Sequence, residues 1–284
     1  MADRVAQRSV PVRQWPQVQA LLPGEPPLSS DLMDVADLLA GIDAELRAGG
    51  SPKRAVQEKA YLKSRLDHYG VSVPAVRAVA RGVANRRPPL EREELLALVE
   101  ALWAGTVYEW RRAAVELLEL GGDRLQPADT VLIERLLRES QTWALVDELA
   151  ALVAGSLVER HPELGVVLDR WAGDPDFWIR RSALLALLVP LRRGGGDFSR
   201  FSRYAETMLE EREFFIRKAI GWVLRDTGRK RPDLVYAWLL PRAGRVSGVT
   251  LTEAIKSLSP AQRAEVLAAR YPYPDGVATS RGLT

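Results

Sequence analysis

Two pairs of residues at helical spacing combine an indole ring with a charged side chain. Trp143 lies four residues before Asp147, and Trp222 lies four residues after Lys218. Residues four apart share one face of an α-helix, so each ring should stand beside its charged partner. Most Trp residues in proteins pack into a core, and we expect core packing for some of Trp103, Trp171 and Trp238. An indole ring beside a charge on a polar face instead favours a stackable, electron-poor ligand such as a nucleobase.

The segments that carry these residues form a repeat. An aromatic residue begins each of four similar segments, at positions 108, 143, 177 and 214, which lie 35, 34 and 37 residues apart. The segments begin Tyr108-Glu-Trp-Arg-Arg112, Trp143-Ala-Leu-Val-Asp147, Phe177-Trp-Ile-Arg-Arg181 and Phe214-Phe-Ile-Arg-Lys218, and a weaker copy covers 253–256. Helix pairs that recur at this period are typical of an α-solenoid of HEAT type, whose stacked repeats present a concave face.

The rest of the chain agrees with an all-α fold. From Asp31 onward apolar residues recur every three to four positions, with no two-residue alternation. We predict an irregular leader over 1–31, a single HEAT-like repeat domain over 32–270 and a C-terminal tail over 271–284. The predicted helices cover 32–48, 53–67, 74–85, 91–103, 108–120, 128–138, 143–157, 163–171, 177–189, 200–209, 213–227, 232–240, 249–257 and 260–268, with Pro and Gly at their boundaries.

Aligning the repeats places basic residues side by side. One column contains Arg112, Asp147, Arg181, Lys218 and Glu253, and the column before it contains Arg111, Arg180 and Arg217. This stripe suits phosphate groups, because Arg guanidinium groups match phosphate geometry. For any single residue the alternative is favoured, namely that it forms a ladder of ion pairs between neighbouring repeats. The stripe as a whole favours a binding surface.

Composition excludes several classes of site. The 284 residues include no Cys and two His, so disulfides, thiol nucleophiles and thiolate metal sites are excluded, and we expect no metal and no cofactor. We expect His68 and His161 to be capping or surface residues. The charge-free apolar stretches at 149–158 and 182–191 are about half the length of a membrane helix, and the N-terminus does not resemble a signal peptide. We therefore predict a cytoplasmic monomer that contacts no membrane.

Several of these motifs resemble those of the AlkD-like DNA alkylation-repair glycosylases. The similarity runs from about Lys59 to Lys256, and its longest motif spans 214–222. The other shared motifs are Tyr61-Leu62-Lys63, Tyr69-Gly70-Val71 with Pro74 and Arg77, Trp143-x-x-x-Asp147 and Trp178-Ile179-Arg180-Arg181. At the position of Trp143 the family commonly has two adjacent Trp residues, whereas this chain has Thr142 and Ala144 on either side of Trp143.

The resemblance implies a HEAT-like fold that binds double-stranded DNA containing alkylated purines on its concave face. It implies that Trp143, Asp147 and Trp222 form the catalytic cleft. It also implies that Arg181 holds a phosphate beside that cleft. Further predicted DNA contacts are Tyr61, Arg225, Lys218, Arg180, Arg217, Lys256 and Arg112.

The implied reaction is hydrolysis of the N-glycosidic bond of a cationic N3- or N7-alkylated purine. Such a base leaves as a neutral molecule, so no general acid is needed, and Asp147 would stabilise the oxocarbenium character of the sugar. Bulky minor-groove adducts are possible substrates, including those of a self-resistance enzyme. The alternative is a non-catalytic HEAT-repeat scaffold that binds DNA or protein, because fold alone does not imply function.

Overall fold

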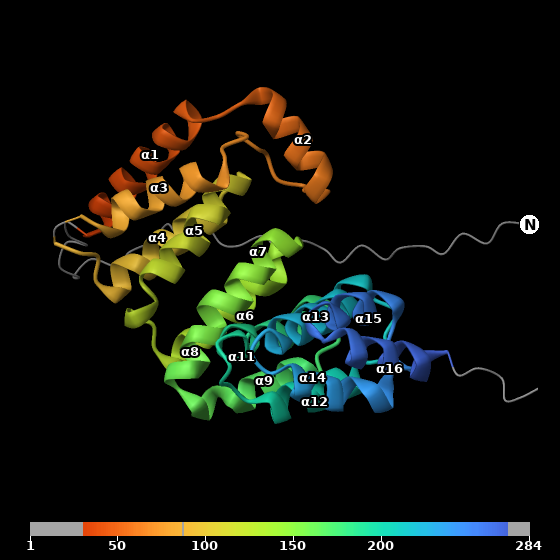
Figure 1. Ribbon diagram of the computed structural model, residues 1–284. Coiled ribbons are helices and arrows are strands. Elements are labelled where there is room, and N and C mark those ends of the chain that lie inside the picture. Colours follow the sequence, from red (N-terminus) through yellow and green to blue (C-terminus); the bar gives the residue numbers. More distant parts are fainter. Residues whose placement is uncertain (1–30, 87, 272–284) are drawn as a thin grey trace, which may run out of the picture.

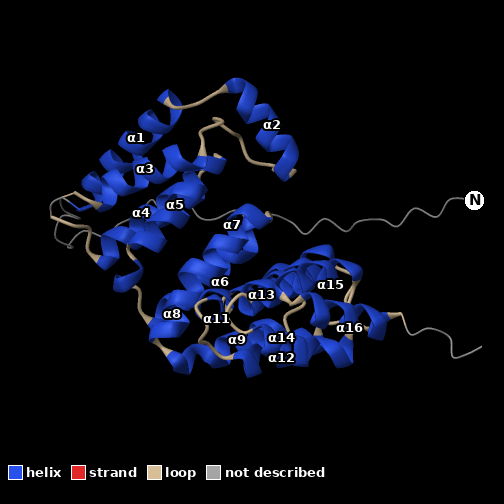
Figure 2. Ribbon diagram, in the orientation of Figure 1, coloured by secondary structure: helices blue, strands red, loops and turns tan. Residues whose placement is uncertain are grey.

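A computed structural model describes residues 31–86 and 88–271 of the chain, and in this part the protein is all-α, with no strand (Figures 1 and 2). A single β-bridge joins Asp67 and Val107. The fold class predicted from the sequence is confirmed. The helices are α1 (Asp31–Ala48), α2 (Pro52–Leu62), α3 (Val73–Ala84), α4 (Arg92–Ala104), α5 (Tyr108–Leu120), α6 (Thr130–Ser140), α7 (Trp143–Glu148), α8 (Gly155–Arg160), α9 (Gly165–Ala172), α10 (Phe177–Leu185), α11 (Leu188–Arg192), α12 (Phe198–Thr207), α13 (Phe214–Gly228), α14 (Pro232–Leu239), α15 (Gly248–Ala254) and α16 (Pro260–Arg270).

The four aromatic residues of the sequence repeat each occupy the first position of a helix. Tyr108, Trp143, Phe177 and Phe214 begin α5, α7, α10 and α13. At two of these helices a carboxylate side chain caps the N-terminus. The Asp176 carboxylate accepts the Trp178 N–H at 2.8 Å, before α10, and the Glu213 carboxylate accepts the Phe215 N–H at 3.1 Å, before α13. Such N-caps satisfy backbone donors that would otherwise lack a partner, so the repeat fixes where these helices begin.

The helices stack broadly in chain order (Figure 1), and their buried apolar side chains form one core cluster. Ala219 and Ile220 of α13, for example, are almost completely buried beneath α15. Gly221 allows α13 and α15 to approach closely, because a Cβ atom there would lie 3.0 Å from the Thr250 carbonyl oxygen. The α7 helix continues through a π-helical segment, Leu149–Ala154, into α8. One continuous core therefore supports the face from which the α7 and α13 side chains project.

Ladders of polar contacts join successive repeats. Side chains 34 to 37 positions apart bond to one another repeatedly, as in Arg112 to Glu148, Arg138 to Asp174, Arg181 to Asp147, Lys218 to Glu253 and Trp238 to Ser202. This spacing equals the repeat length found in the sequence. Many of the basic residues that recur with the repeat therefore bind the carboxylate of a neighbouring repeat, as the ladder interpretation predicts.

The second predicted helix is too long. The sequence predicts helix over 53–67, whereas α2 ends at Leu62, and Lys63 follows in the left-handed conformation with φ 50°. The reason lies far along the chain, because the Asp67 backbone bonds to the backbone at Thr106 and Tyr108. The Glu109 carboxylate also accepts the N–H groups of residues 69–71. Similarly, the helix predicted over 177–189 is divided into α10 and α11.

None of the helices in the described ranges is both long and apolar enough to cross a membrane. The predicted leader and tail lie outside the described residues, apart from Asp31, which begins α1, and Tyr271. The single-domain, monomeric and cytoplasmic assignments stay predictions.

Candidate active site

A cavity of about 430 Å³ lies between the first and second halves of the helix stack. Trp143 and Asp147 of α7, Trp222 of α13 and Tyr61 of α2 all line it. The structure thus brings together four residues that span about 160 positions of the sequence. Its remaining walls are Glu58, Leu62, Val73, Arg77, Tyr108, Arg112, Ala144, Glu148, Ala151, Leu152, Leu188, Val189 and Arg192.

Asp147 is held rigidly by one partner. Arg181 of α10 donates from Nε to Oδ1 at 2.7 Å and from Nη2 to Oδ2 at 2.8 Å, and its Nη1 donates to the Phe215 carbonyl. The Asp147 side chain keeps 14% of its surface exposed, whereas that of Arg181 keeps 3%. A bidentate pair fixes the direction of a carboxylate as well as its position. Asp147 is therefore a preorganised anion that faces the cavity, while Arg181 lies behind it.

Aromatic rings line the same cavity as this carboxylate. The Tyr61 ring, on a side chain that is 72% exposed, meets the Trp143 ring edge-on, with centroids 6.0 Å apart. The indole N–H of Trp222 donates to Asp226 at 3.1 Å, and Arg192 pairs with the same carboxylate at 2.8 Å. The orientation of the Trp222 ring is therefore fixed. Indole faces of this kind favour a flat or cationic ligand.

Two further carboxylates line the cavity. Glu148 pairs with Arg112 at 2.5 Å and with Arg77 at 3.2 Å, and its Oε2 is buried without a hydrogen-bond partner in the described chain. Burial raises the pKa of Glu148 above its ordinary value, and Arg112 opposes the rise. Burial likewise raises the pKa of Glu58. The cavity thus combines three carboxylates with arginine side chains and an apolar wall.

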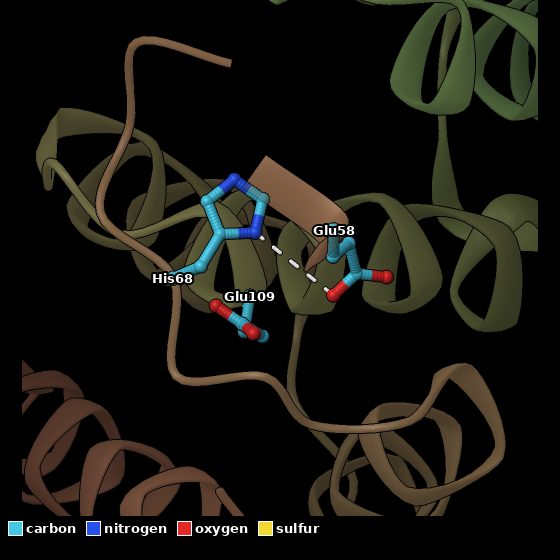
Figure 3. Close-up of side chains that lie close together, drawn as sticks. All are labelled: Glu58, His68 and Glu109. Atoms are coloured by element: carbon cyan, nitrogen blue, oxygen red, sulfur yellow. Dashed lines mark ion pairs between the residues drawn. The ribbon is translucent and has the colours of Figure 1, made fainter. Parts of the chain in front are cut away.

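Glu58 belongs to a cluster with His68 and Glu109 (Figure 3). The His68 side chain is 1% exposed, and its Nδ1 atom lies 3.9 Å from Oε2 of Glu58. The imidazole ring stacks on the Tyr108 ring, with centroids 4.6 Å apart. The His68 side chain is therefore buried, and the expectation of a capping or surface residue is wrong for it, because α2 ends before His68 and the ring packs on Tyr108.

These three side chains are the metal-compatible group found among the described residues, with one ligand atom from each lying within 4.8 Å of the others. However, the Glu109 oxygens already accept the N–H groups of Tyr69, Gly70 and Val71 at 3.0, 2.7 and 3.1 Å. A carboxylate committed to three backbone donors holds a loop in place. We therefore assign Glu109 a structural role.

The family model described as DNA alkylation repair enzyme matches residues 42–258, which include the cleft residues. The chain belongs to this family. The sequence matches none of the curated proteins.

Two solved structures show the same fold. A predicted DNA alkylation repair enzyme from Enterococcus faecalis is 24% identical, with a TM-score of 0.67, over 74% of this chain and 97% of that one. AlkD2 from Streptococcus mutans is 18% identical, with a TM-score of 0.52, over 74% of this chain and 100% of that one. At this level of identity the two structures support the fold alone, so the assignment to the DNA alkylation repair enzyme family depends on the family model.

In this member of the family most of the predicted DNA contacts are paired within the protein. Arg180 binds Glu211 at 2.7 Å, and Arg217 donates to the Glu211 carbonyl at 2.6 Å. Glu253 accepts from Lys218, Arg225 and Lys256 at 2.8, 2.5 and 3.0 Å. These three cations hold the pKa of Glu253 at about 2.

The individual cations of the stripe therefore pair within the protein, as the ladder alternative predicts for each of them. Arg112 is 5% exposed and Arg181 is 2% exposed, because an unpaired buried charge is costly and a carboxylate of the next repeat lies within reach. The DNA contacts of these residues stay a prediction. Tyr61 differs from them, since its ring is exposed at the edge of the cleft.

Glu58, Glu148 and Arg192 were not predicted from the sequence, although all three line the cavity. For Glu148 a signal existed, because it follows Arg112 by 36 positions, which is one repeat. Glu58 precedes the aligned repeats, so the repeat pattern could not indicate it.

Proposed function

We propose that this protein is a DNA glycosylase that hydrolyses the N-glycosidic bond of cationic N3- and N7-alkylated purines in duplex DNA. One observation carries the proposal. A carboxylate fixed by a bidentate arginine shares one cavity with two indole rings from different repeats. Membership of the DNA alkylation repair enzyme family supports it.

The chemistry of the substrate fits these groups. An alkylated purine already carries a positive charge, so the bond from C1′ to the base nitrogen breaks with its electron pair going to the base. The base leaves neutral, and the sugar gains oxocarbenium character. The Asp147 carboxylate stabilises that charge without reorganising, because Arg181 already holds it in place. The indole faces of Trp143 and Trp222 stabilise the cationic base and the cationic sugar.

Water completes the reaction by adding to C1′ while a proton is lost, which leaves an abasic site. Asp147 orients this water. We propose a monofunctional enzyme, because no Lys of the described residues lines the cavity to form a Schiff base with the sugar. We also propose that it needs neither a metal nor a cofactor and acts as a monomer.

The size of the cavity bears on substrate range. A volume of about 430 Å³ with apolar walls at Leu62, Val73, Leu152 and Val189 accommodates groups larger than a methyl group. We therefore propose bulky minor-groove purine adducts as additional substrates.

The test is release of free base from duplex DNA treated with a methylating agent, in the presence of EDTA. Chromatography should detect 3-methyladenine or 7-methylguanine above the spontaneous rate, and a duplex carrying a bulky N3 adduct should be assayed in parallel. If the protein binds these duplexes but releases neither small nor bulky bases, it is a non-catalytic scaffold and the proposal is wrong.

A further inference from the structure

A second cavity adjoins the cleft and has a different character. It encloses about 470 Å³ and is lined by residues 63–66 after α2, by Arg111 of α5 and by residues 139–142 between α6 and α7. Lys63 follows Leu62 of the cleft wall directly, and Thr142 directly precedes Trp143. The Tyr61–Trp143 contact therefore lies at the boundary between the two cavities.

Three cations line this second cavity without a carboxylate partner in the described part of the chain. Lys63 and Arg65 are exposed and make no ion pair there. Arg111 stacks over the Trp103 ring at 5.0 Å and donates to the Glu139 carbonyl at 3.0 Å. This distinguishes them from Arg112, Arg181 and Lys218, whose charges are neutralised within the ladders.

The single carboxylate at this cavity is already occupied. Glu139 accepts the Trp103 indole N–H at 2.8 Å and pairs with Arg135 at 3.3 Å. Glu139 therefore does not neutralise the three cations fully. The cavity carries excess positive charge, which favours an anion.

Two buried polar atoms in the walls have no hydrogen-bond partner among the described residues. They are Oγ1 of Thr142, a residue that is only 5% exposed, and Nε of Arg111. Thr142 precedes α7 at the capping position, yet its hydroxyl does not cap the helix. Buried polar atoms without partners are costly, and a bound anion in this cavity would supply the missing partner for both.

The backbone around the cavity is also unusual. Lys63 and Gln141 are the non-glycine residues with positive φ in the described chain, at 50° and 48°, and both line this cavity. Non-glycine residues in this conformation are concentrated at binding sites. Both end a helix here, so that the residues after them turn towards the cavity.

We propose that the second cavity binds a backbone phosphate of the DNA strand whose damaged nucleotide occupies the cleft. The inference rests on the proposed function, because it takes DNA as the ligand. A phosphate group accepts hydrogen bonds from several donors at once, and Lys63, Arg65, Arg111 and the Thr142 hydroxyl supply them. Such a contact positions the strand in any sequence context, as repair requires.

The test measures binding of undamaged duplex DNA to the full-length protein as a function of salt. The double variant Lys63→Ala, Arg65→Ala is compared with Arg263→Ala, which removes an exposed α16 cation that has no ion pair in the described chain. The double variant should make the dependence of log affinity on log salt shallower by about one to two units, whereas Arg263→Ala should not change it. Equal slopes for the double variant and wild type would overturn the proposal.

A second variant separates binding from folding. Thr142→Val keeps the shape of the side chain and removes the unpartnered hydroxyl, so it should weaken DNA binding without lowering the melting temperature. Unchanged affinity would remove Thr142 from the proposed contact.

Inorganic phosphate distinguishes the source of the anion. If phosphate ion binds wild type and not the double variant, while the salt dependence of DNA binding is the same in both, the cavity holds a small anion and the proposal for DNA is wrong. Because undamaged DNA is used, a failure to excise bases would refute the proposed function without affecting this result.

Discussion

Asp147→Asn should separate the catalytic role that we propose for this carboxylate from its structural role as the partner of Arg181. The substitution keeps the shape of the side chain and removes the charge opposite the developing oxocarbenium ion. Loss of one preorganised electrostatic group typically costs about 3–4 kcal/mol of transition-state stabilisation, or a rate decrease of roughly 10²–10³. The labile leaving group reduces this effect, so single-turnover rates at saturating enzyme are the quantity to compare.

The same change also affects folding. Arg181 is 2% exposed and would lose its charged partner, although the Asn oxygen can still accept one of its hydrogen bonds. Breaking a buried pair on one side costs about 3 kcal/mol. For a domain of this size that lowers the melting temperature by roughly 6–12 °C. Excision should therefore be measured at 25 °C, where both proteins are folded, and circular dichroism should follow the thermal unfolding.

Asp174→Asn is the matched control. Asp174 accepts a bidentate pair from Arg138 at 3.0 and 2.6 Å, one repeat apart, and it does not line the cleft. Asp174→Asn should destabilise the protein less than Asp147→Asn does, because Arg138 is 37% exposed and keeps Glu134 as a partner, and it should leave the excision rate unchanged. Equal excision rates for Asp147→Asn and wild type would refute the reasoning and make Asp147 a ladder residue.

Three further changes have expected outcomes. Arg181→Ala should lower the melting temperature by stranding Asp147 and leave the salt dependence of DNA binding unchanged, whereas a shallower dependence would establish the phosphate contact predicted from the sequence. Burial holds the pKa of His68 below its usual 6.5, so the unfolded chain binds the proton more readily and wild type loses stability as the pH falls below about 6.5. His68→Phe should show a smaller loss in urea titrations between pH 7 and pH 5, and an identical loss would contradict this assignment. Gly70→Ala should cost more than about 1 kcal/mol in the same titrations, because Gly70 has φ +76° and a Cβ atom would clash with the Ser51 carbonyl; unchanged stability would show that the loop can adjust.

The repeat could be predicted from sequence because it is a local signal. Tyr108, Trp143, Phe177 and Phe214 each begin a helix, where the aromatic column placed them. The grouping of Trp143, Asp147 and Trp222 followed from the resemblance to a known family, and the structure places all three in one cavity. Their catalytic role stays a prediction.

The remaining features depend on contacts between distant residues. The sequence around Leu62 contains no Gly or Pro that would signal the end of a helix. Helix α2 stops there because the loop after it bonds to Thr106, Tyr108 and Glu109. The pairing of cations within the ladders was only partly predictable, because the aligned column includes Asp147 and Glu253, which pair with Arg181 and Lys218, but not Glu148, which pairs with Arg112. The second cavity was unpredictable for the same reason, because its residues come from three separate segments.

The central claim is that the Trp143–Asp147–Trp222 cleft breaks a glycosidic bond. The most direct measurement uses a duplex with a single 7-methylguanine, saturating wild-type protein and EDTA, and follows the masses of both products over time. We predict free 7-methylguanine and an intact strand that carries one abasic site, formed much faster than in buffer alone. Loss of the base at the buffer rate, from a duplex that the protein demonstrably binds, would contradict the claim.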